Sequence, residues 1–132
     1  MTGPKGMIRR SERGSAAVQF AMAVPLVVLF LAGIAQLGVL FAATAGLQQA
    51  LGEGARMATL FPRPTDAAIS ARVTRARFAL DSRYLTGPSL THGISNGVPY
   101  VDISLTYSPP LNFVFFTGPS ISITKSRRAY QN

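Results

Sequence analysis

The feature that most limits the fold of this chain is an uncharged stretch near its amino terminus. Residues 14 to 52 contain no Asp, Glu, Lys or Arg, and most of them are apolar. A helix needs roughly 20 predominantly apolar residues to cross a bilayer, so this stretch is long enough to span one and continue beyond it. A buried core helix of that length would need a larger protein around it than 132 residues provide. The stretch therefore predicts a membrane segment.

A short basic tail precedes the uncharged stretch and carries Lys5, Arg9, Arg10 and Arg13. Only Arg56 lies close behind the stretch, and this excess of positive charge in front predicts that the amino terminus stays in the cytoplasm. An ordinary secretory signal has an apolar segment of about 7 to 15 residues followed by a small-residue cut site. Here the apolar segment is longer and the small residues come first. We therefore expect residues 1–14 to be a flexible leader and the apolar helix to be retained.

Residues 15–60 are expected to form one long helix, which Pro25 could kink and Pro62 would stop. About 45 helical residues reach about 68 Å, of which a bilayer takes about 30 Å, so the second half should project into the far compartment. That half predicts a polar face of Gln48, Gln49, Glu53 and Arg56 and an apolar face of Leu47, Ala50, Leu51, Ala55 and Ala58. Two explanations fit Gly33, Gly38, Gly46, Gly52 and Gly54: packing surfaces against other helices, or the general frequency of glycine in membrane helices.

Residues 61–132 predict a small exported α+β domain with a second helix and about three antiparallel strands. Thr65 is a suitable N-cap and Asp66 suits the helix dipole, and this helix should end near Tyr84. Strand patterns follow in residues 90–97, 98–107 and 120–130, with Asn96-Gly97 as a tight turn. Residues 111–119 are expected to form an apolar loop that serves either as an interface or as the base of the core. The predicted core residues are Val101, Ile103, Leu105, Ile121 and Ile123.

Residues that could carry chemistry are sparse. The chain has no cysteine and one histidine, His92, in a Gly/Ser/Asn-rich region where a surface role is favoured. The exported part has four carboxylates, and no two share a helix or strand spacing. The pattern indicates no enzyme, no cofactor, no metal site and no small-molecule substrate. Although the formal net charge is +8, no nucleic-acid motif accompanies it, so the basic residues are interpreted as a solvated surface.

The arrangement around Gly14 favours chemistry done to the chain. A peptidase at the inner membrane face needs a cut site that is extended and small. Glycine meets this need because it lacks a side chain and disfavours helix, and Arg13 beside it would hold the site at anionic headgroups. We therefore interpret the bond between Gly14 and Ser15 as a processing site.

The segment "RGSAAVQFAMAVPLVVLFLAGIAQLGVLF" resembles the amino-terminal signature of TadE-like proteins, the minor pilins or pseudopilins of the Flp/Tad branch of type IV pilus systems. The basic leader, Gly14 with the small residues after it, Phe20, Pro25 and "GIAQLG" carry the resemblance. The later "LQQALGEGARMA" resembles the family's amphipathic continuation, and the carboxy-terminal half agrees only loosely.

The resemblance implies a subunit of the bacterial inner membrane that a prepilin peptidase cuts after Gly14. The carboxy-terminal domain would lie in the periplasm or in an extracellular filament used for adhesion or secretion. Implied partners are other pilin or pseudopilin subunits, the prepilin peptidase, the Tad inner-membrane platform proteins and the lipid bilayer.

Two positions depart from the family pattern. Gln19 stands where the family typically has glutamate, and Gln36 stands at a second site that is usually acidic. A lone carboxylate in lipid costs at least about 2.5 kcal/mol, and the family's glutamate is thought to pair with a neighbouring subunit's new amino terminus. One hypothesis is that Gln19 removes this ionic lock and suits a tip, priming or scaffold subunit. The other is that Gln19 is a tolerated variant without consequence.

Two other classes of protein remain open at this point. The chain could be an uncleaved single-span adaptor whose exported domain binds a partner protein. It could also be an anchored envelope enzyme, which the lone histidine and the dispersed carboxylates argue against.

Overall fold

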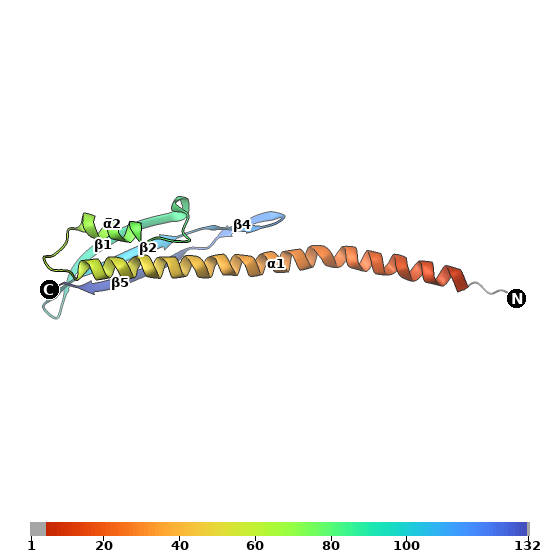
Figure 1. Ribbon diagram of the computed structural model, residues 1–132, viewed down its shortest axis with the longest axis horizontal. Coiled ribbons are helices and arrows are strands. Elements are labelled where there is room, and N and C mark those ends of the chain that lie inside the picture. The colour runs from red at the N-terminus through yellow and green to blue at the C-terminus, as the bar shows by residue number, and fades with distance from the viewer. Residues whose placement is uncertain (1–4, 132) are drawn as a thin grey trace.

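The structure, a computed structural model, describes residues 5–131, with side chains from residue 14 onward. It forms a long rod with a small domain along one half (Figure 1). The element order is α1 (Lys5–Ala58), α2 (Asp66–Arg75), the 3₁₀ turn η1 (Ser82–Tyr84), β1 (Leu85–Ser95), β2 (Val98–Tyr107), β3 (Pro110–Phe113), β4 (Phe116–Ser120) and β5 (Ile123–Tyr130). This is the α+β class expected from the sequence.

Helix α1 is continuous over 54 residues and passes through Pro25 without a break. The projecting half has the predicted apolar face, because Leu47, Ala50, Leu51, Ala55 and Ala58 are all buried. The helix begins at Lys5, ten residues before the expected start, so Gly14 is helical. One glycine costs only about 1 kcal/mol relative to alanine in a helix, which is too little to end a helix that good helix formers continue on both sides.

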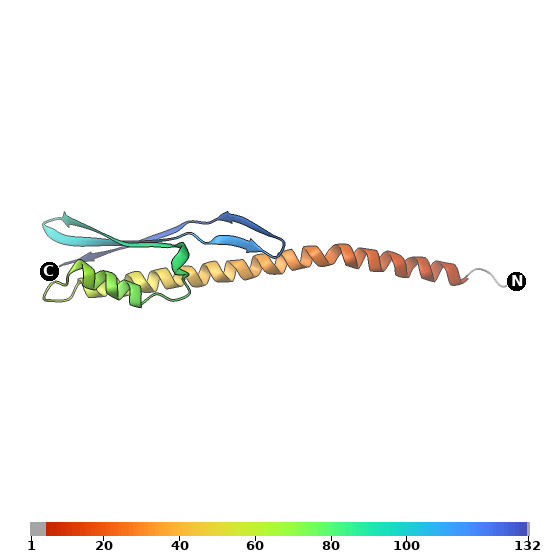
Figure 2. The ribbon, with the colours of Figure 1, turned by 90° about the horizontal axis from the view of Figure 1, so that it is seen from above.

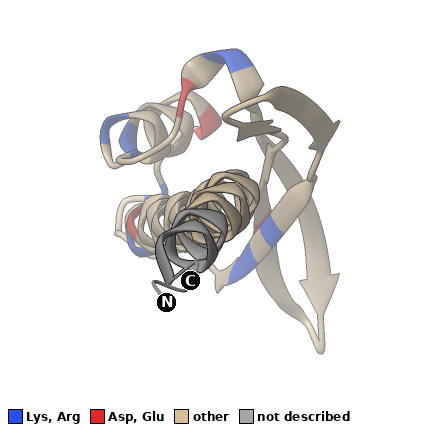
Figure 3. Cartoon of the chain, turned by 90° about the vertical axis from the view of Figure 1, so that its right-hand side faces the viewer, with Lys and Arg blue, Asp and Glu red and all other residues tan. Residues whose placement is uncertain are grey.

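The sheet is antiparallel with the order β1-β2-β5, and Figures 2 and 3 show both helices on one of its faces. Strand β2 alternates as predicted: Val101, Ile103 and Leu105 are buried against the helices. The opposite face is polar, with a pair between Asp102 and Arg128 and a hydroxyl contact between Thr106 and Thr124. Asn96 and Gly97 have positive φ and form the predicted turn between β1 and β2.

The core lies where α1, α2 and the sheet meet. Its largest fully buried side chains are Leu47, Leu51, Ile69, Val73, Val101, Ile103 and Leu105. Burying one such side chain stabilises a fold by about 1.5 to 3 kcal/mol, so the second half of α1 is held to the domain by apolar contact. Ile123 packs on the edge of this core, whereas the predicted core residue Ile121 is 38% exposed. The prediction for Ile121 was wrong because β5 begins only at Ile123 and Ile121 lies in the preceding connection.

Helix α2 starts as expected and ends early. The Thr65 hydroxyl accepts a hydrogen bond from the backbone amide of Ala68, as an N-cap should. The helix stops at Arg75, nine residues before the expected end. The chain then turns onto α1, where the Phe78 carbonyl lies against Gly46 and Ala79 takes a φ of 54°. Because a side chain at position 46 would collide with that carbonyl, Gly46 makes the close approach possible.

The glycines of α1 therefore divide into two groups. Gly46 packs against Phe78, and Gly54 packs against Val73 and Ile103 of the same chain. The expectation that these two contact other helices of an assembly was wrong, because the chain's own domain covers them. Side chains added at Gly33 and Gly38 would meet open space, and their packing partners stay a prediction.

Residues 111–119 do not form the expected loop. Strands β3 and β4 make a separate antiparallel hairpin, with Phe113 paired to Phe116 and their rings stacked at 4.9 Å between centroids. The hairpin extends from the sheet alongside α1 toward its amino-terminal half (Figures 1 and 2).

Candidate functional site: the exposed apolar half of helix α1

The first half of α1 leaves large apolar side chains uncovered. We call residues 15–42 the apolar segment. Its exposed members include Val18, Phe20, Met22, Leu26, Phe30, Leu31, Ile34, Leu37 and Phe41. Phe20 and Phe41 are each 72% exposed, which is unusual for phenylalanine in water. A continuous apolar surface of this kind marks a contact with lipid or with protein.

Helix α1 is long and apolar enough to cross a membrane. Between Gly14 and Ala58 its most apolar 18-residue window has a mean hydropathy of 2.5, and only 6% of that window is buried inside the protein. The low burial separates this helix from the core helix of a soluble protein, whose apolar residues are covered by its own fold. These properties are those of a helix that could span a membrane.

The predicted processing residues Gly14 and Ser15 are both exposed, and a side chain built at Gly14 would meet no neighbour within 4 Å. No other part of the described chain covers Gly14. It lies in a helix, however, so the expectation of an extended cut site was wrong for the uncut chain. The leader residues Lys5, Arg9, Arg10 and Arg13 occupy the first turns of α1, and their side chains lie outside the described residues.

The remaining predicted residues separate along the helix. Gln19 and Phe20 are exposed near its start, and Pro25 lies within it. Gln36 is half-buried, because its side-chain amide donates a hydrogen bond to the carbonyl oxygen of Asn112 in β3. The sequence analysis missed this contact. The signal that could have found it is the pair Phe113 and Phe116, which flank a two-residue turn as hairpin partners do.

Among residues 14–131, charged side chains are confined to the half of the molecule that bears the domain. Glu53 of α1 pairs with Arg72 of α2 at 2.6 Å, and this hydrogen bond holds the pKa of Glu53 below its usual range. Arg83 lowers the pKa of Asp81 in the same way. His92 lies on β1, and its Nε2 is 3.0 Å from both carboxylate oxygens of Asp66. The pairs of Glu53 with Arg72 and of Asp66 with His92 join different elements, whereas the pair of Asp81 with Arg83 lies within one turn.

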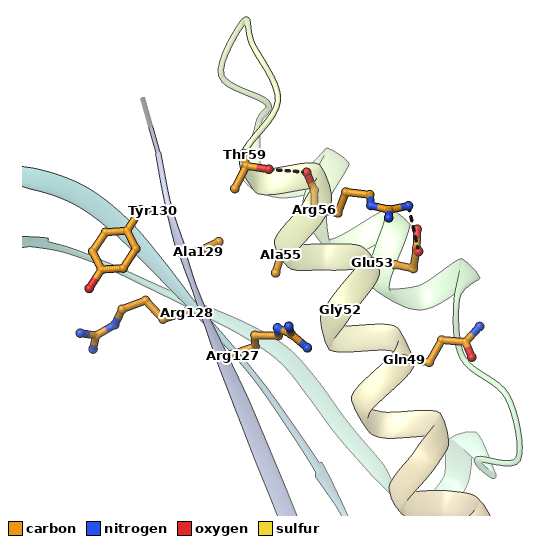
Figure 4. Close-up of a pocket in the computed structure, with 10 residues that line it drawn as sticks. All are labelled: Gln49, Gly52, Glu53, Ala55, Arg56, Thr59, Arg127, Arg128, Ala129 and Tyr130. Atoms are coloured by element: carbon orange, nitrogen blue, oxygen red, sulfur yellow. Dashed lines mark hydrogen bonds and ion pairs between the residues drawn. The ribbon is translucent and has the colours of Figure 1, made fainter.

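An open groove of about 670 Å³ lies between α1 and β5 (Figure 4). Arg127 projects from β5 toward Gly52, with Nη1 3.7 Å from where a side chain there would begin, whereas Arg128 points away. The groove's carboxylate, Glu53, is already paired with Arg72 and has a lowered pKa, so it is a weak base. Among residues 14–131, no three His, Asp or Glu side chains are grouped to hold a metal ion.

Comparison with known families identifies the helix. Residues 14–56 match the family of TadE-like proteins. Helix α1 carries a TadE-like segment. The match starts at Gly14 and ends at Arg56, and so covers the apolar segment and the half that bears the domain, while α2 and the strands lie outside it. A search of curated proteins gave no match, and neither did a search of solved structures.

The TadE-like segment confirms the resemblance stated from the sequence. A segment of this kind suggests an association with Tad pili. Helix α1 is also long and apolar enough to span a membrane, which is consistent with a membrane-anchored pilus protein.

Proposed function

We propose that this protein is a minor pilin or pseudopilin of a Tad-type (Flp) pilus or secretion system. One observation carries the proposal: the TadE-like match begins at Gly14, where a basic leader meets an exposed apolar helix. Removal of the leader would leave a helix whose first half has apolar surface on all sides. Neighbouring subunits could cover that surface in a filament, and lipid would cover it before assembly.

The membrane orientation follows from the charges. The basic leader stays in the cytoplasm of the bacterial cell, and the domain enters the periplasm. In the membrane, the chain would meet a prepilin peptidase and the Tad platform proteins, and then other pilin subunits. The helical state of Gly14 fits this sequence of events, because a glycine weakens a helix by about 1 kcal/mol and so favours local opening at the bond to be cut.

The processing step is tested by intact-mass measurement of the membrane-extracted protein after co-expression with the prepilin peptidase of the same system. Cleavage between Gly14 and Ser15 is expected. Gly14→Leu should abolish cleavage, whereas the control Gly38→Leu should be cut normally. Neither position has a neighbour within 4 Å of an added side chain, so misfolding would not explain a difference. Recovery of only full-length chain would contradict the proposal and favour the second candidate, an uncleaved single-span adaptor.

The role of Gln19 is tested separately. If its neutral side chain lacks the ionic lock to a neighbouring amino terminus, Gln19→Glu should leave cleavage intact and raise the fraction of this protein in sheared filaments. The exposed site leaves room for either side chain. An unchanged or lower fraction would show that the ionic lock does not restrict this subunit, and a tip or priming role would lose its support.

A further inference from the structure

The β3–β4 hairpin occupies a position that the proposed function does not explain. It leaves the domain beside α1, and its turn reaches along the apolar segment in both lengthwise views (Figures 1 and 2). The hydrogen bond from Gln36 to the carbonyl oxygen of Asn112 ties the hairpin to the helix. The hairpin therefore lies at a defined height on the rod.

The end of the hairpin is apolar and uncovered. Val114, Phe115 and Phe116 are 66%, 63% and 56% exposed. The stacked rings of Phe113 and Phe116 hold the two strands together behind the turn. We call residues 113–116 the hairpin tip. Three consecutive large apolar side chains exposed at a turn are costly in water, which indicates that another phase or molecule covers them.

Charge is absent from the surroundings of the tip. No Asp, Glu, Lys or Arg occurs between Asp102 and Lys125, just as none occurs in residues 14–52. The two uncharged stretches meet where the hairpin lies beside α1 at Gln36. A water-facing surface of a small domain normally carries mixed charges, so this end is built for apolar surroundings.

The position of the tip along α1 favours the lipid bilayer as the apolar environment of the tip. From Ser15 to Gln36 a helix rises about 32 Å at 1.5 Å per residue, close to the 30 Å or so of a hydrocarbon core. Gln36 thus falls at the outer boundary of the core when the span starts at Ser15. The turn residues of the tip, Val114 and Phe115, lie two and three residues beyond Asn112, which is at most about 7 to 10 Å at 3.3 Å per residue. That distance places the tip within the depth that interfacial segments reach, about 5 to 10 Å.

We propose that the hairpin tip inserts into the outer leaflet of the membrane that α1 spans, so that the domain contacts the bilayer at two points. This inference rests on the membrane anchorage in the proposed function. Aromatic side chains favour the membrane–water boundary, and Phe115 and Phe116 would occupy it. The second contact would fix the tilt and rotation of the domain above the membrane.

The chain contains no tryptophan, so a single introduced tryptophan reports on one position. The full-length Phe115→Trp protein is reconstituted into phosphatidylcholine vesicles with lipids brominated near the glycerol end of their acyl chains. Bromine quenches tryptophan on contact. We expect a blue-shifted emission and a marked loss of intensity relative to vesicles without bromine. Lipids brominated near the methyl end should quench it less, because the tip is shallow.

Two matched variants separate the tip from the anchor. Phe30→Trp lies in the apolar segment, 69% exposed, and should be quenched if α1 spans the bilayer. Phe61→Trp lies at the opposite end of the domain, 90% exposed, and should remain unquenched. Quenching at position 30 without quenching at 115 would overturn the inserted hairpin and leave the anchor intact. No quenching at position 30 would overturn the anchor itself.

Lowering the protein density by adding lipid distinguishes a protein partner of the tip from the bilayer. If the tip instead packs against a second copy of the chain, quenching at position 115 should be weak at high protein density and the blue shift should disappear as lipid is added. Strong quenching that does not change with the lipid-to-protein ratio is the expected result. A blue shift that depends on protein density would overturn the proposal.

Discussion

Helix α1 carries no charge from Gly14 to Gly52, yet the two parts of this stretch have opposite surroundings. Phe30 and Leu37 are exposed by more than half, whereas Leu47 and Leu51 are buried almost completely. The difference is in the small residues. In the second half, alanines and glycines at Ala43, Gly46, Ala50 and Gly54 allow α2 and the sheet to approach closely. In the first half, large side chains point in all directions, as lipid permits. Hydrophobicity alone therefore does not say which solvent covers a helix; side-chain size around its circumference does.

The largest effect on the domain's free energy of unfolding should come from removing a buried side chain in the second half of α1. Leu47→Ala removes a side chain with no exposed surface from the centre of the core, and such changes cost about 2 to 5 kcal/mol. The four tyrosines all lie between residues 84 and 130, so tyrosine fluorescence during denaturation in detergent reports on the domain alone. The matched control Leu37→Ala, at a position 55% exposed, should leave the domain's free energy of unfolding unchanged. Equal losses in both variants would mean that the two halves share one core.

Smaller effects are expected at two glycines, where substitution by alanine should destabilise the protein at one position and favour the helix at the other. An alanine Cβ at Gly46 would lie 2.1 Å from the Phe78 carbonyl oxygen, so the backbone must shift, and overpacking of this kind costs about 1 to 3 kcal/mol. At Gly38 nothing lies within 4 Å, so Gly38→Ala should gain helix propensity without a clash. The same tyrosine assay measures the first variant, and helix content by circular dichroism checks the second. A stable Gly46→Ala domain would show that the contact with Phe78 is not close.

The cap of α2 should contribute less. Thr65→Ala removes the hydroxyl that accepts from the Ala68 amide, and loss of an N-cap typically costs about 1 kcal/mol. Because α2 packs on the second half of α1 through Ile69 and Val73, the domain's unfolding midpoint should fall slightly. Thr65→Ser keeps the cap and serves as the control. If serine and alanine destabilise the domain equally, the methyl group of Thr65, rather than its hydroxyl, is what matters.

The smallest effect is a pH dependence confined to the domain. Hydrogen bonds from Arg128 hold the pKa of Asp102 below its ordinary value of 3.8. A lowered folded-state pKa contributes stability above the unfolded value, and this contribution is lost as the pH falls through the folded value. Wild type should therefore lose more stability than Asp102→Asn between pH 5 and pH 2.5 or so, by a small margin because the pair is half-exposed and screened by salt. Identical pH profiles would show that the pair is energetically silent.

These contrasts also explain what the sequence could predict. Long-range periodicity identified α1, the apolar face that starts at Leu47, and the alternation of Val101, Ile103 and Leu105, because each pattern repeats over several turns or residues. The early end of α2 was missed because it depends on a tertiary contact, the approach of the Phe78 carbonyl to Gly46. The β3–β4 hairpin was missed because a four-residue strand of mixed apolar and polar residues has no distinct period.

Some features of the candidate site could likewise be predicted from the sequence, and others could not. The position of Gly14 ahead of the apolar segment and the family resemblance were readable from the sequence, and the TadE-like match covers both. The contact between Gln36 and Asn112 was not, because the two residues are 76 positions apart. The helical state of Gly14 was missed because the sequence analysis gave too much weight to one glycine. The residues on both sides of Gly14 continue the helix, and one glycine does not interrupt it.

The start of α1 and the end of β5 lie at opposite ends of the rod (Figure 1), and α1 and β5 run toward the same end. Strand β5 is joined to β2 by paired residues along its whole length, from Ile123 to Tyr130. A pull between the amino-terminal half of α1 and the end of β5 is therefore directed along these strands and loads their hydrogen bonds together in shear rather than one at a time. A subunit of this shape resists tension along its own axis best, and it would yield first to a sideways force that peels the sheet from the helix.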